Sequence, residues 1–247
     1  MKQLLAVILI SLSPAALAQT APPAQQAPAR QTDAEERLHN DFAWLGRYQE
    51  ANAKVTGPVE VVFMGDSITQ GWFDMMPNFF TPGRQGRGIS GQTTPQMLLR
   101  FRQDVIDLHP RVVQIMAGTN DIAGNTGPMT AEQTRANLMS MAELARAHGI
   151  RVILASIPPA DHFPWRPGIA PAAKIAALND WMKDYAARTG AVYADYWSAL
   201  HDGQAFKAAW SSDGVHPNKA GYAVMAPVAE AAIRSALAKP APKAMRQ

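Results

Sequence analysis

Val59-Glu-Val-Val-Phe-Met-Gly-Asp-Ser-Ile-Thr-Gln-Gly-Trp72 is the stretch around which the chain is organised. Five of its first six residues are apolar, which predicts a buried strand over 59–64. The run breaks at Gly65-Asp66-Ser67, and a helix is expected from Ile68. A serine on the turn from a buried strand into a helix stands where α/β proteins usually display a reactive group. The alternative is that Ser67 only caps the helix, as serines often do.

Four further segments are expected to form strands, and the segments between them are expected to form helices. The later strands are expected over 86–90, 112–116, 150–156 and 191–194. The helices are expected over 33–54, from Pro95 onward, and over 130–148, 171–189 and 218–238, with a capping box at Thr130-Ala-Glu-Gln133. Strands that alternate with helices predict an α/β fold with a parallel sheet covered on both faces.

The two ends of the chain are expected to lie outside the folded domain. Lys2, the apolar run 4–12 and Ala16-Leu-Ala18 form the pattern of a secretory signal peptide over 1–18, with an apolar run too short to span a membrane. Residues 19–32 are rich in Pro, Ala and Gln, which predicts a flexible spacer. A single domain is expected over 33–239, followed by a tail over 240–247.

The first expected helix carries an apolar stripe. Its members recur at spacings of three and four residues, namely Leu38, Phe42, Leu45 and Tyr48. We interpret this stripe as core packing on the outside of the sheet rather than as a ligand site.

Composition excludes several classes of protein. The chain has 247 residues, 47% of them hydrophobic, which suits one globular domain with a sizeable core. It has no cysteine, so it has no disulfide, thiolate nucleophile or cysteine-ligated zinc. Loss of Lys2 with the signal peptide leaves 22 basic and 20 acidic residues, and no basic cluster is interleaved with aromatics, so nucleic-acid binding is not expected. No later segment is apolar for long enough to insert stably in a membrane. Export without disulfides favours a bacterial periplasm or the extracellular medium.

Candidate functional residues follow the expected strands. Ser67 follows the first strand, Gly91 the second and Asn120 the third. Because ligands bind outside the carboxyl ends of parallel strands, these residues are expected at one edge of the sheet. Near the C-terminus, Asp213-Gly-Val-His216 places a carboxylate and an imidazole three residues apart on one turn.

Together these residues supply the parts of a serine hydrolase. A serine hydroxyl is a poor nucleophile until a base removes its proton, and His216 is the candidate base. Asp213 can hold the imidazole in the required tautomer and stabilise the cation that forms. The candidate oxyanion donors are the backbone N–H groups of Ser67 and Gly91 and the side-chain amide of Asn120, each worth about 3 kcal/mol.

Each residue also has a simpler interpretation. Asp213 and His216 are common in turns and caps, Asn120 is a common turn residue, and Gly91 alone says little. A metal site at Asp213 and His216 is not expected, because no third histidine or carboxylate stands at ligand spacing.

Four short blocks, taken together, resemble the SGNH (GDSL-type) esterase and lipase superfamily in its usual order over about residues 58–236. These blocks are Gly65-Asp-Ser-Ile-Thr69, Gly91, Gly118-Thr-Asn-Asp121 and Asp213-Gly-Val-His216-Pro217. The resemblance implies a flavodoxin-like α/β/α sandwich of about five parallel strands and hydrolysis of esters without a cofactor. It also implies that Ser67 is the nucleophile, that Asp213 and His216 complete the triad, and that Gly91 and Asn120 are oxyanion donors.

The second block departs from the family pattern. Many relatives have Asn before Arg-Gly-Ile-Ser-Gly and Asp after it, whereas this chain has Gly86 and Gln92. We expect this change to loosen the loop and to weaken the contribution of Gly91, without touching the triad.

The pocket wall is expected to come from the loops after the strands, with Trp72, His162 and Trp165 as candidate residues. Ordinary burial or loop packing is the alternative for each of them. The expected substrate is a small-molecule or glycan ester with a short acyl group, such as a glycan O-acetyl ester. The alternatives are a lysophospholipase or thioesterase, transfer of the acyl group to a glycan hydroxyl, and an inactive carbohydrate-binding module. The last would lack Ser, His or Asp, and none is missing here.

Overall fold

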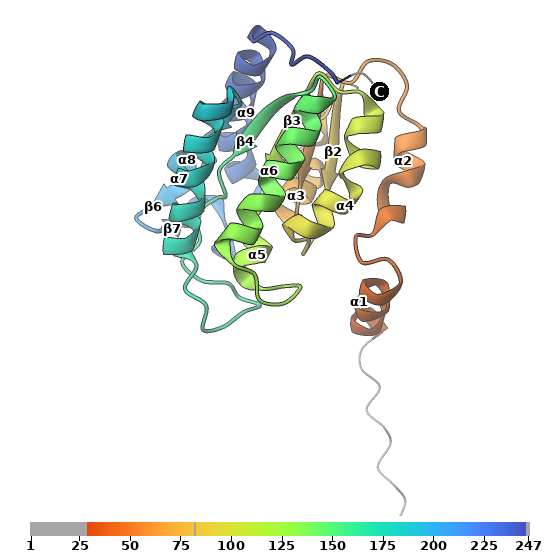
Figure 1. Ribbon diagram of the computed structural model, residues 1–247. Coiled ribbons are helices and arrows are strands. Elements are labelled where there is room, and N and C mark those ends of the chain that lie inside the picture. The colour runs from red at the N-terminus through yellow and green to blue at the C-terminus, as the bar shows by residue number, and fades with distance from the viewer. Residues whose placement is uncertain (1–28, 82, 246–247) are drawn as a thin grey trace, which may run out of the picture.

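A computed structural model describes residues 29–81 and 83–245 of the protein. Five parallel strands form one sheet between two layers of helices (Figure 1), as the sequence predicts. The strands are β1 Val61–Gly65, β2 Arg84–Gly88, β3 Val112–Met116, β4 Arg151–Ala155 and β5 Val192–Ala194. Their order across the sheet is β2-β1-β3-β4-β5, so β1 lies between β2 and β3.

The two faces of the sheet are buried against different helices, because successive side chains of a strand point to opposite faces. From β1, Val62 and Met64 join the core beneath α4 Thr94–Asp104, α6 Ala131–Ala147 and α7 Ala172–Thr189. Val61 and Phe63 join the core beneath α3 Ser67–Met75, α8 Tyr196–Leu200 and α9 Lys219–Ala238. Full burial of each such side chain stabilises the fold by about 1.5–3 kcal/mol.

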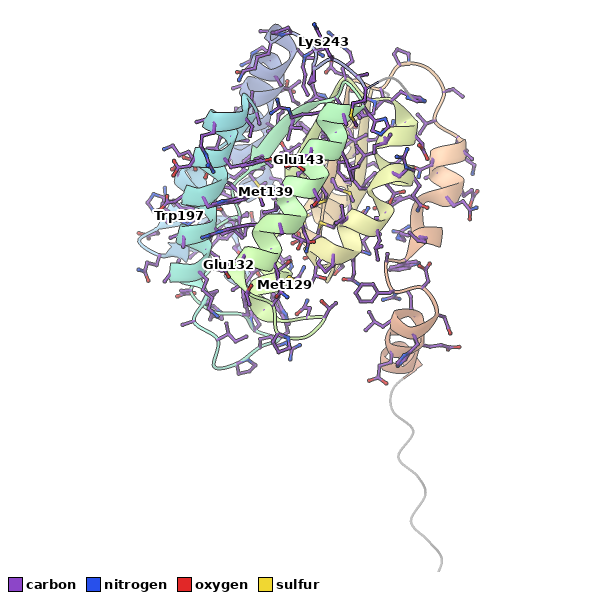
Figure 2. The ribbon with its side chains drawn as sticks, in the orientation of Figure 1. Met129, Glu132, Met139, Glu143, Trp197 and Lys243 are labelled. Atoms are coloured by element: carbon purple, nitrogen blue, oxygen red, sulfur yellow. The ribbon has the colours of Figure 1, made fainter. Side chains whose placement is uncertain are left out.

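The helix α6 shows how the sequence pattern places one face inward. Leu138 and Met141 are buried, whereas Glu132 and Glu143 are exposed along the same helix (Figure 2). The expected capping box is present, since Thr130 Oγ1 accepts from the Gln133 N–H at 3.2 Å and Gln133 Oε1 accepts from the Thr130 N–H at 2.8 Å. The helix ends before Gly149, whose φ of +77° favours glycine.

Several short elements were not predicted, because patterns of five residues or fewer carry little signal. They are α5 Thr119–Ala123, α8, the hairpin β6 His201–Asp202 with β7 Ala205–Phe206, and 3₁₀ turns at Pro77–Phe79, Ile106–Leu108 and Ala208–Trp210. Of these, α5 matters for the site because it carries Asn120.

The prediction of one helix over 33–54 is wrong. The segment forms α1 Ala29–Asn40, a 3₁₀ turn at Leu45–Tyr48 and α2 Gln49–Ala53. Asp41 breaks the helix because its carboxylate accepts from the N–H groups of Leu45 and Gly46, and Trp44 takes the left-handed conformation at φ 51°. The expected apolar stripe is not core packing, since Leu38, Phe42 and Leu45 are exposed.

The described residues include only part of the predicted chain ends. The signal peptide over 1–18 and residues 19–28 of the spacer lie outside the described residues. The predicted end of the spacer at residue 32 is too late in the chain, because α1 begins at Ala29. Among the helices in 29–81 and 83–245, none has the length and apolarity needed to cross a membrane.

Candidate active site

Ser67 lies at the first position of α3, immediately after β1. The cap of that helix is Asp66, whose Oδ1 accepts from the Ile68 N–H at 3.0 Å. The serine hydroxyl is therefore not used for capping, and it lies 2.9 Å from Nε2 of His216. The tight turn needs Gly65, because a Cβ there would lie 2.1 Å from Oγ1 of Thr69.

Asp213 and His216 meet on the turn that precedes α9. His216 Nδ1 lies 2.7 Å from Asp213 Oδ2, so the imidazole bridges the carboxylate and Ser67 Oγ. The second carboxylate oxygen accepts from the N–H groups of Val215 and His216 at 2.9 and 2.8 Å. This arrangement presents the geometry of a nucleophile, a base and an orienting acid.

Ser211 fixes the same turn, and sequence reasoning did not single it out. Its hydroxyl donates to the His216 carbonyl oxygen at 2.8 Å and accepts from the Gly214 N–H at 3.0 Å. A further contact of 3.2 Å joins it to Asp213 Oδ1. Its neighbouring position in the Ser211-Ser-Asp213 run was the only available signal.

The two aspartates near Ser67 have opposite pKa shifts. Burial pushes the pKa of Asp213 upward, but hydrogen bonds from the His216 backbone, the His216 ring and the Val215 backbone outweigh it and lower the pKa to about 2. Burial instead dominates at Asp66 and raises its pKa to about 6, against the lowering effects of the Ile68 N–H and His216. Asp213 is thus the carboxylate that stays ionised beside the imidazole.

Asn120 lies on α5 with its amide oriented by three neighbours. Nδ2 donates to the Gln92 carbonyl oxygen at 3.0 Å and lies 3.4 Å from Asp66 Oδ2, while Oδ1 accepts from Asn125 at 2.8 Å. The Gln92 carbonyl oxygen needs a donor and the Asn125 amide nitrogen needs an acceptor. This orientation of the Asn120 side chain supplies both, with Nδ2 toward Gln92 and Oδ1 toward Asn125.

Gly91 lies at a position that only glycine adopts readily, with φ of +78°. Its carbonyl oxygen accepts from Asn125 Nδ2 at 3.2 Å. Asn125 therefore joins Gly91 and Asn120, the two residues predicted as oxyanion donors besides Ser67.

The expected loosening of the second block is wrong. Gln92 is buried, its Nε2 donates to the Ala43 carbonyl oxygen at 2.7 Å, and its Oε1 accepts from Arg100 Nε at 2.6 Å. Gly86 packs on the Phe73 ring, where a Cβ would meet ring atoms at 3.0–3.2 Å. Both departures from the family pattern are thus accommodated by contacts that hold the loop.

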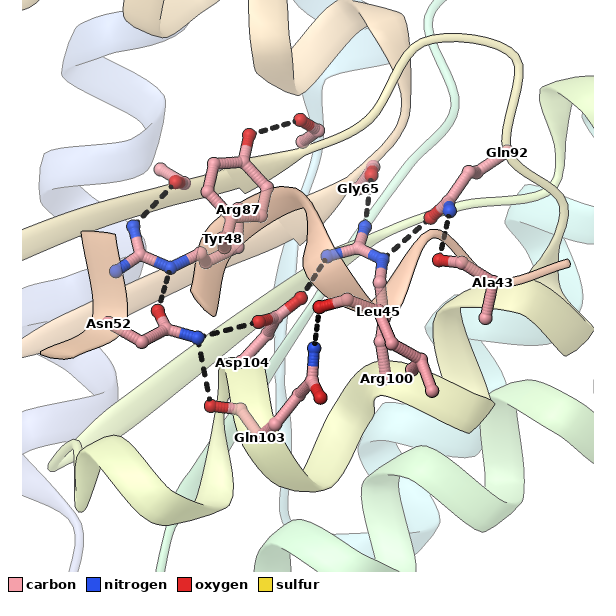
Figure 3. Close-up of polar contacts among 12 residues, drawn as sticks. Ala43, Leu45, Tyr48, Asn52, Gly65, Arg87, Gln92, Arg100, Gln103 and Asp104 are labelled. Atoms are coloured by element: carbon pink, nitrogen blue, oxygen red, sulfur yellow. Dashed lines mark hydrogen bonds and ion pairs between the residues drawn. The ribbon is translucent and has the colours of Figure 1, made fainter. Parts of the chain in front are cut away.

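Arg100 is the centre of a buried polar network behind the site (Figure 3). Its guanidinium donates to the Gly65 carbonyl oxygen at 3.0 Å, to Gln92 Oε1, and to Asp104 Oδ2 at 3.0 Å. Asn52 extends the network, donating to Asp104 at 2.7 Å and accepting from Arg87 at 2.8 Å. The Arg100 side chain thereby joins the end of β1, two residues before Ser67, to the loop that carries Gly91.

Of the three predicted pocket residues, one is buried in the core and two lie beside the triad. Trp72 does not line a pocket, because it is 0% exposed and packs among Phe63, Phe79 and Tyr222 in the core. Trp72 lies on the side of α3 that faces the sheet, where its large apolar ring is buried in the core.

Trp165 and His162 do lie beside the triad. The centre of the Trp165 ring lies 6.0 Å from that of His216, and its Nε1 donates to Asn125 Oδ1 at 3.0 Å. His162 is exposed, lies 2.6 Å from Asp161 Oδ1, and sits so near Gly214 that a Cβ there would lie 2.8 Å from its Cε1. His162 therefore packs on the Asp213–His216 turn and does not contact Ser67.

In the described part of the chain, no group of three or more His, Cys, Asp or Glu residues is arranged to hold a metal ion. The side chains gathered at the carboxyl ends of the strands are those of nucleophilic chemistry: a hydroxyl, an imidazole, a carboxylate and an amide donor.

Comparison with known proteins places this arrangement in a family. The model of the GDSL-like lipase/acylhydrolase family matches residues 63–224. A solved GDSL-like lipase from Bacteroides thetaiotaomicron VPI-5482 is 46% identical, with a TM-score of 0.76 over 79% of this chain and 100% of that one. Axe2, an acetylxylan esterase from Geobacillus stearothermophilus, is 21% identical with a TM-score of 0.56 over 73% of this chain and 96% of that one, which concerns the fold alone.

A curated relative matches a shorter part of the chain. It is named "Uncharacterized lipoprotein YqeF", from Bacillus subtilis (strain 168), and is 36% identical over 134 residues. The match covers 47% of this chain and 55% of that protein, so it spans about half the length of the relative.

Proposed function

The chain belongs to the GDSL-like lipase/acylhydrolase family, and on that premise we propose that it is an exported serine esterase that cleaves carboxylic esters of short acyl groups. The observation that carries the proposal is the line of contacts from Ser67 Oγ to His216 Nε2 at 2.9 Å and from His216 Nδ1 to Asp213 at 2.7 Å. An unactivated hydroxyl is a poor nucleophile, and this line supplies the base and the acid that activate it.

Acylation begins when His216 Nε2 takes the Ser67 proton as Oγ attacks the ester carbonyl carbon. The carbonyl oxygen becomes an oxyanion, which the N–H groups of Ser67 and Gly91 and the amide of Asn120 stabilise. Asp213 stabilises the imidazolium. Collapse of the intermediate breaks the bond to the alcohol oxygen, to which His216 returns the proton, and leaves the acyl group on Ser67.

Deacylation repeats these steps with water. His216 takes a proton from the water as its oxygen attacks the acyl carbon, and the same donors stabilise the second oxyanion. The proton then passes from His216 to Ser67 Oγ as the carboxylic acid leaves. If a sugar hydroxyl replaces the water, the same site becomes a glycan O-acyltransferase.

Export and a short acyl group are supported by features outside the triad. The pattern over 1–18 is that of a secretory signal peptide, and the relative YqeF is named a lipoprotein. We assign the protein to the bacterial periplasm or the extracellular medium. The structural neighbour Axe2 is named an acetylxylan esterase, which makes glycan O-acetyl groups the first substrates to examine.

The test is hydrolysis of 4-nitrophenyl acetate by the purified protein and by Ser67→Ala. We expect the substitution to remove activity by a factor of about 10⁶, as loss of a triad nucleophile does elsewhere. Ser140→Ala, on α6 away from the strand ends, is the matched control and should retain wild-type activity. Activity that survives Ser67→Ala would contradict the nucleophile assignment.

A panel of esters then separates the alternatives. Acyl chains from acetate to laurate on one alcohol, together with a lysophospholipid and an acyl thioester, measure the acyl preference. Addition of an acceptor sugar tests transfer, because an acylated sugar in place of free acid identifies an acyltransferase. A protein without activity on any member would be a binding module on the same fold.

A further inference from the structure

A groove of about 670 Å³ adjoins the proposed catalytic residues. One wall is the N-terminal segment of residues 37–44, and the other consists of the loops after β2, β3 and β4. Figure 1 shows α1 at the same end of the molecule as α5, the end toward which the strands run. The side chains that line both walls include Arg37, Phe42, Trp44, Asn125, Trp165 and Arg166.

The groove lies next to the catalytic residues, although Ser67, Asp213 and His216 are not part of its lining. Gly91, a proposed oxyanion donor, is part of its lining. Trp165 also lines it, and the ring of Trp165 lies 6.0 Å from that of His216. The alcohol of an ester departs beside the base that protonates it. The groove therefore extends from the side of the site where the alcohol part of the substrate lies.

The charge of the groove is positive. Arg37 and Arg166 are part of its lining, and no aspartate or glutamate is. The nearby Asp41 carboxylate is occupied by the N–H groups of Leu45 and Gly46, at 2.7 and 3.1 Å. Among residues 35–81 and 83–245, neither arginine has a carboxylate at ion-pair distance, and the Arg166 guanidinium donates to the Gly124 carbonyl oxygen at 3.0 Å.

The groove also presents flat apolar faces. Phe42 is 39% exposed and Trp165 is 38% exposed, although large aromatic side chains are usually buried. Trp44, at φ 51°, also lines the groove, and the Arg37 guanidinium lies over one face of its ring, 3.9 Å from the ring centre. Aromatic faces stack on the carbon face of a sugar ring, and a guanidinium pairs in the same plane with carboxylate or phosphate oxygens.

The N-terminal wall is fixed to the catalytic loops by buried hydrogen bonds. Gln92 donates to the Ala43 carbonyl oxygen at 2.7 Å, and Gln96 donates to that of Phe42 at 2.6 Å. Gln92 directly follows Gly91. These bonds fix the position of the N-terminal wall relative to Gly91, a proposed oxyanion donor.

We propose that this groove binds the alcohol part of the ester, and that this part is a sugar ring carrying an anionic group recognised by Arg37 and Arg166. The inference rests on the proposed esterase function and adds the substrate class to it. The aromatic faces hold the ring, and the two guanidinium groups hold its carboxylate or phosphate.

The experiment compares three monoacetates of a methyl glucoside, acetylated at the same hydroxyl. Carbon 6 carries a carboxylate in the first, a phosphate in the second and a neutral hydroxyl in the third. Acetate release gives kcat/KM for each. We expect the better anionic ester to exceed the neutral one by about tenfold, which corresponds to about 1.4 kcal/mol. The carboxylate and phosphate arms show which anion the groove prefers.

Variants identify the arginines as the cause. Arg37→Gln and Arg166→Gln should each lower the ratio of anionic to neutral kcat/KM, and the double variant should bring it close to one. Arg47→Gln removes a charge three residues beyond the N-terminal segment and outside the groove lining, so it is the matched control and should keep the wild-type ratio. The preference should also shrink as salt rises, because exposed charges are screened.

The outcomes separate this inference from the proposed function. Equal kcat/KM for the three sugars, or an unchanged ratio in the double variant, overturns the inference while the esterase stands. Hydrolysis of 4-nitrophenyl acetate without hydrolysis of any charged sugar ester overturns it as well. Failure on 4-nitrophenyl acetate and on all three sugars refutes the esterase itself.

Discussion

Arg100, wholly buried on α4, donates a hydrogen bond of 3.0 Å to the carbonyl oxygen of Gly65, two residues before the proposed nucleophile. The same guanidinium bonds to Gln92, next to Gly91, and to Asp104. The relative position of two catalytic loops thus depends on one side chain that contacts no substrate.

Replacing Arg100 should destabilise the protein and misplace the loops. Arg100→Met leaves the buried Asp104 with the Asn52 amide but without its charged partner, which is expected to lower the free energy of unfolding by about 3–5 kcal/mol. Urea unfolding measures this loss. Arg102→Met, on the exposed side of the same helix, is the control and should change stability by no more than about 0.5 kcal/mol.

A second variant separates positioning from stability. Arg100→Lys keeps a charge beside Asp104 but cannot bond to Gly65 and Gln92 together, because an ammonium lacks the planar fork. We expect kcat to fall with KM little changed, since the oxyanion donors contribute in the transition state. An unaltered kcat in a folded Arg100→Lys protein would assign Arg100 a purely structural role.

Asp213→Asn should lower kcat by about 10⁴-fold, because an amide favours the wrong imidazole tautomer. The pKa of Asp213 is about 2, so its carboxylate stays ionised throughout the weakly acidic range. Acidification to pH 4 should therefore not remove activity through protonation of Asp213. Steady-state kinetics of Asp213→Asn on 4-nitrophenyl acetate check its role, and a wild-type kcat in the folded variant would speak against the triad.

Asn120→Ala should lower kcat by about 10²–10³-fold through loss of one oxyanion donor. KM should change little, because the donor acts mainly on the developing charge. Asn125→Ala removes the amide that bonds to Asn120 Oδ1 but no proposed donor, so its effect should be smaller. Steady-state kinetics on the same ester compare the two; equal losses would mean that Asn120 acts only by holding the loop.

Asp66 should make stability depend on pH. Burial raises its pKa from 3.8 to about 6, so the folded state binds this proton more tightly than the unfolded chain does. Its contribution to the free energy of unfolding is full below pH 3.8 and is lost as pH rises through 6, by about 3 kcal/mol at most. Urea titrations between pH 4 and 7 should show a smaller loss in Asp66→Asn. Asp74→Asn, exposed on the same helix, is the control for removal of a carboxylate; identical slopes in wild type and Asp66→Asn would refute the assignment.

The strand pattern and the four family blocks predicted the parallel sheet correctly, and the structure places Ser67, Asp213, His216, Gly91 and Asn120 at its carboxyl edge. The observed strand ends differ from the predicted ones by up to two residues. For example, β1 is predicted over 59–64 and found at Val61–Gly65. The apolar runs of β1, β3 and β4 are recognisable in the sequence because these strands are almost wholly buried on both faces, whereas β2 and β5 are only partly buried.

Trp72 and the N-terminal segment show where local patterns fail. An indole next to a nucleophile can face the pocket or the core, and only the packing of α3 on the sheet decided that Trp72 is buried. The stripe of Leu38, Phe42 and Leu45 predicted a packed helix, but Asp41 ended the helix and left these side chains exposed beside the groove.

By itself, then, the sequence determined the fold class, the family and the residues of the proposed triad, because each depends on patterns within a few positions. Only the tertiary structure decided that Asp66 rather than Ser67 caps α3, that Arg100 joins the two loops, and that Arg37 and Arg166 face one groove. Arg100 and Gly65 are 35 positions apart, and Arg37 and Arg166 are 129 positions apart, so these residues come near one another through burial and hydrogen bonding in the assembled fold and not through local propensity.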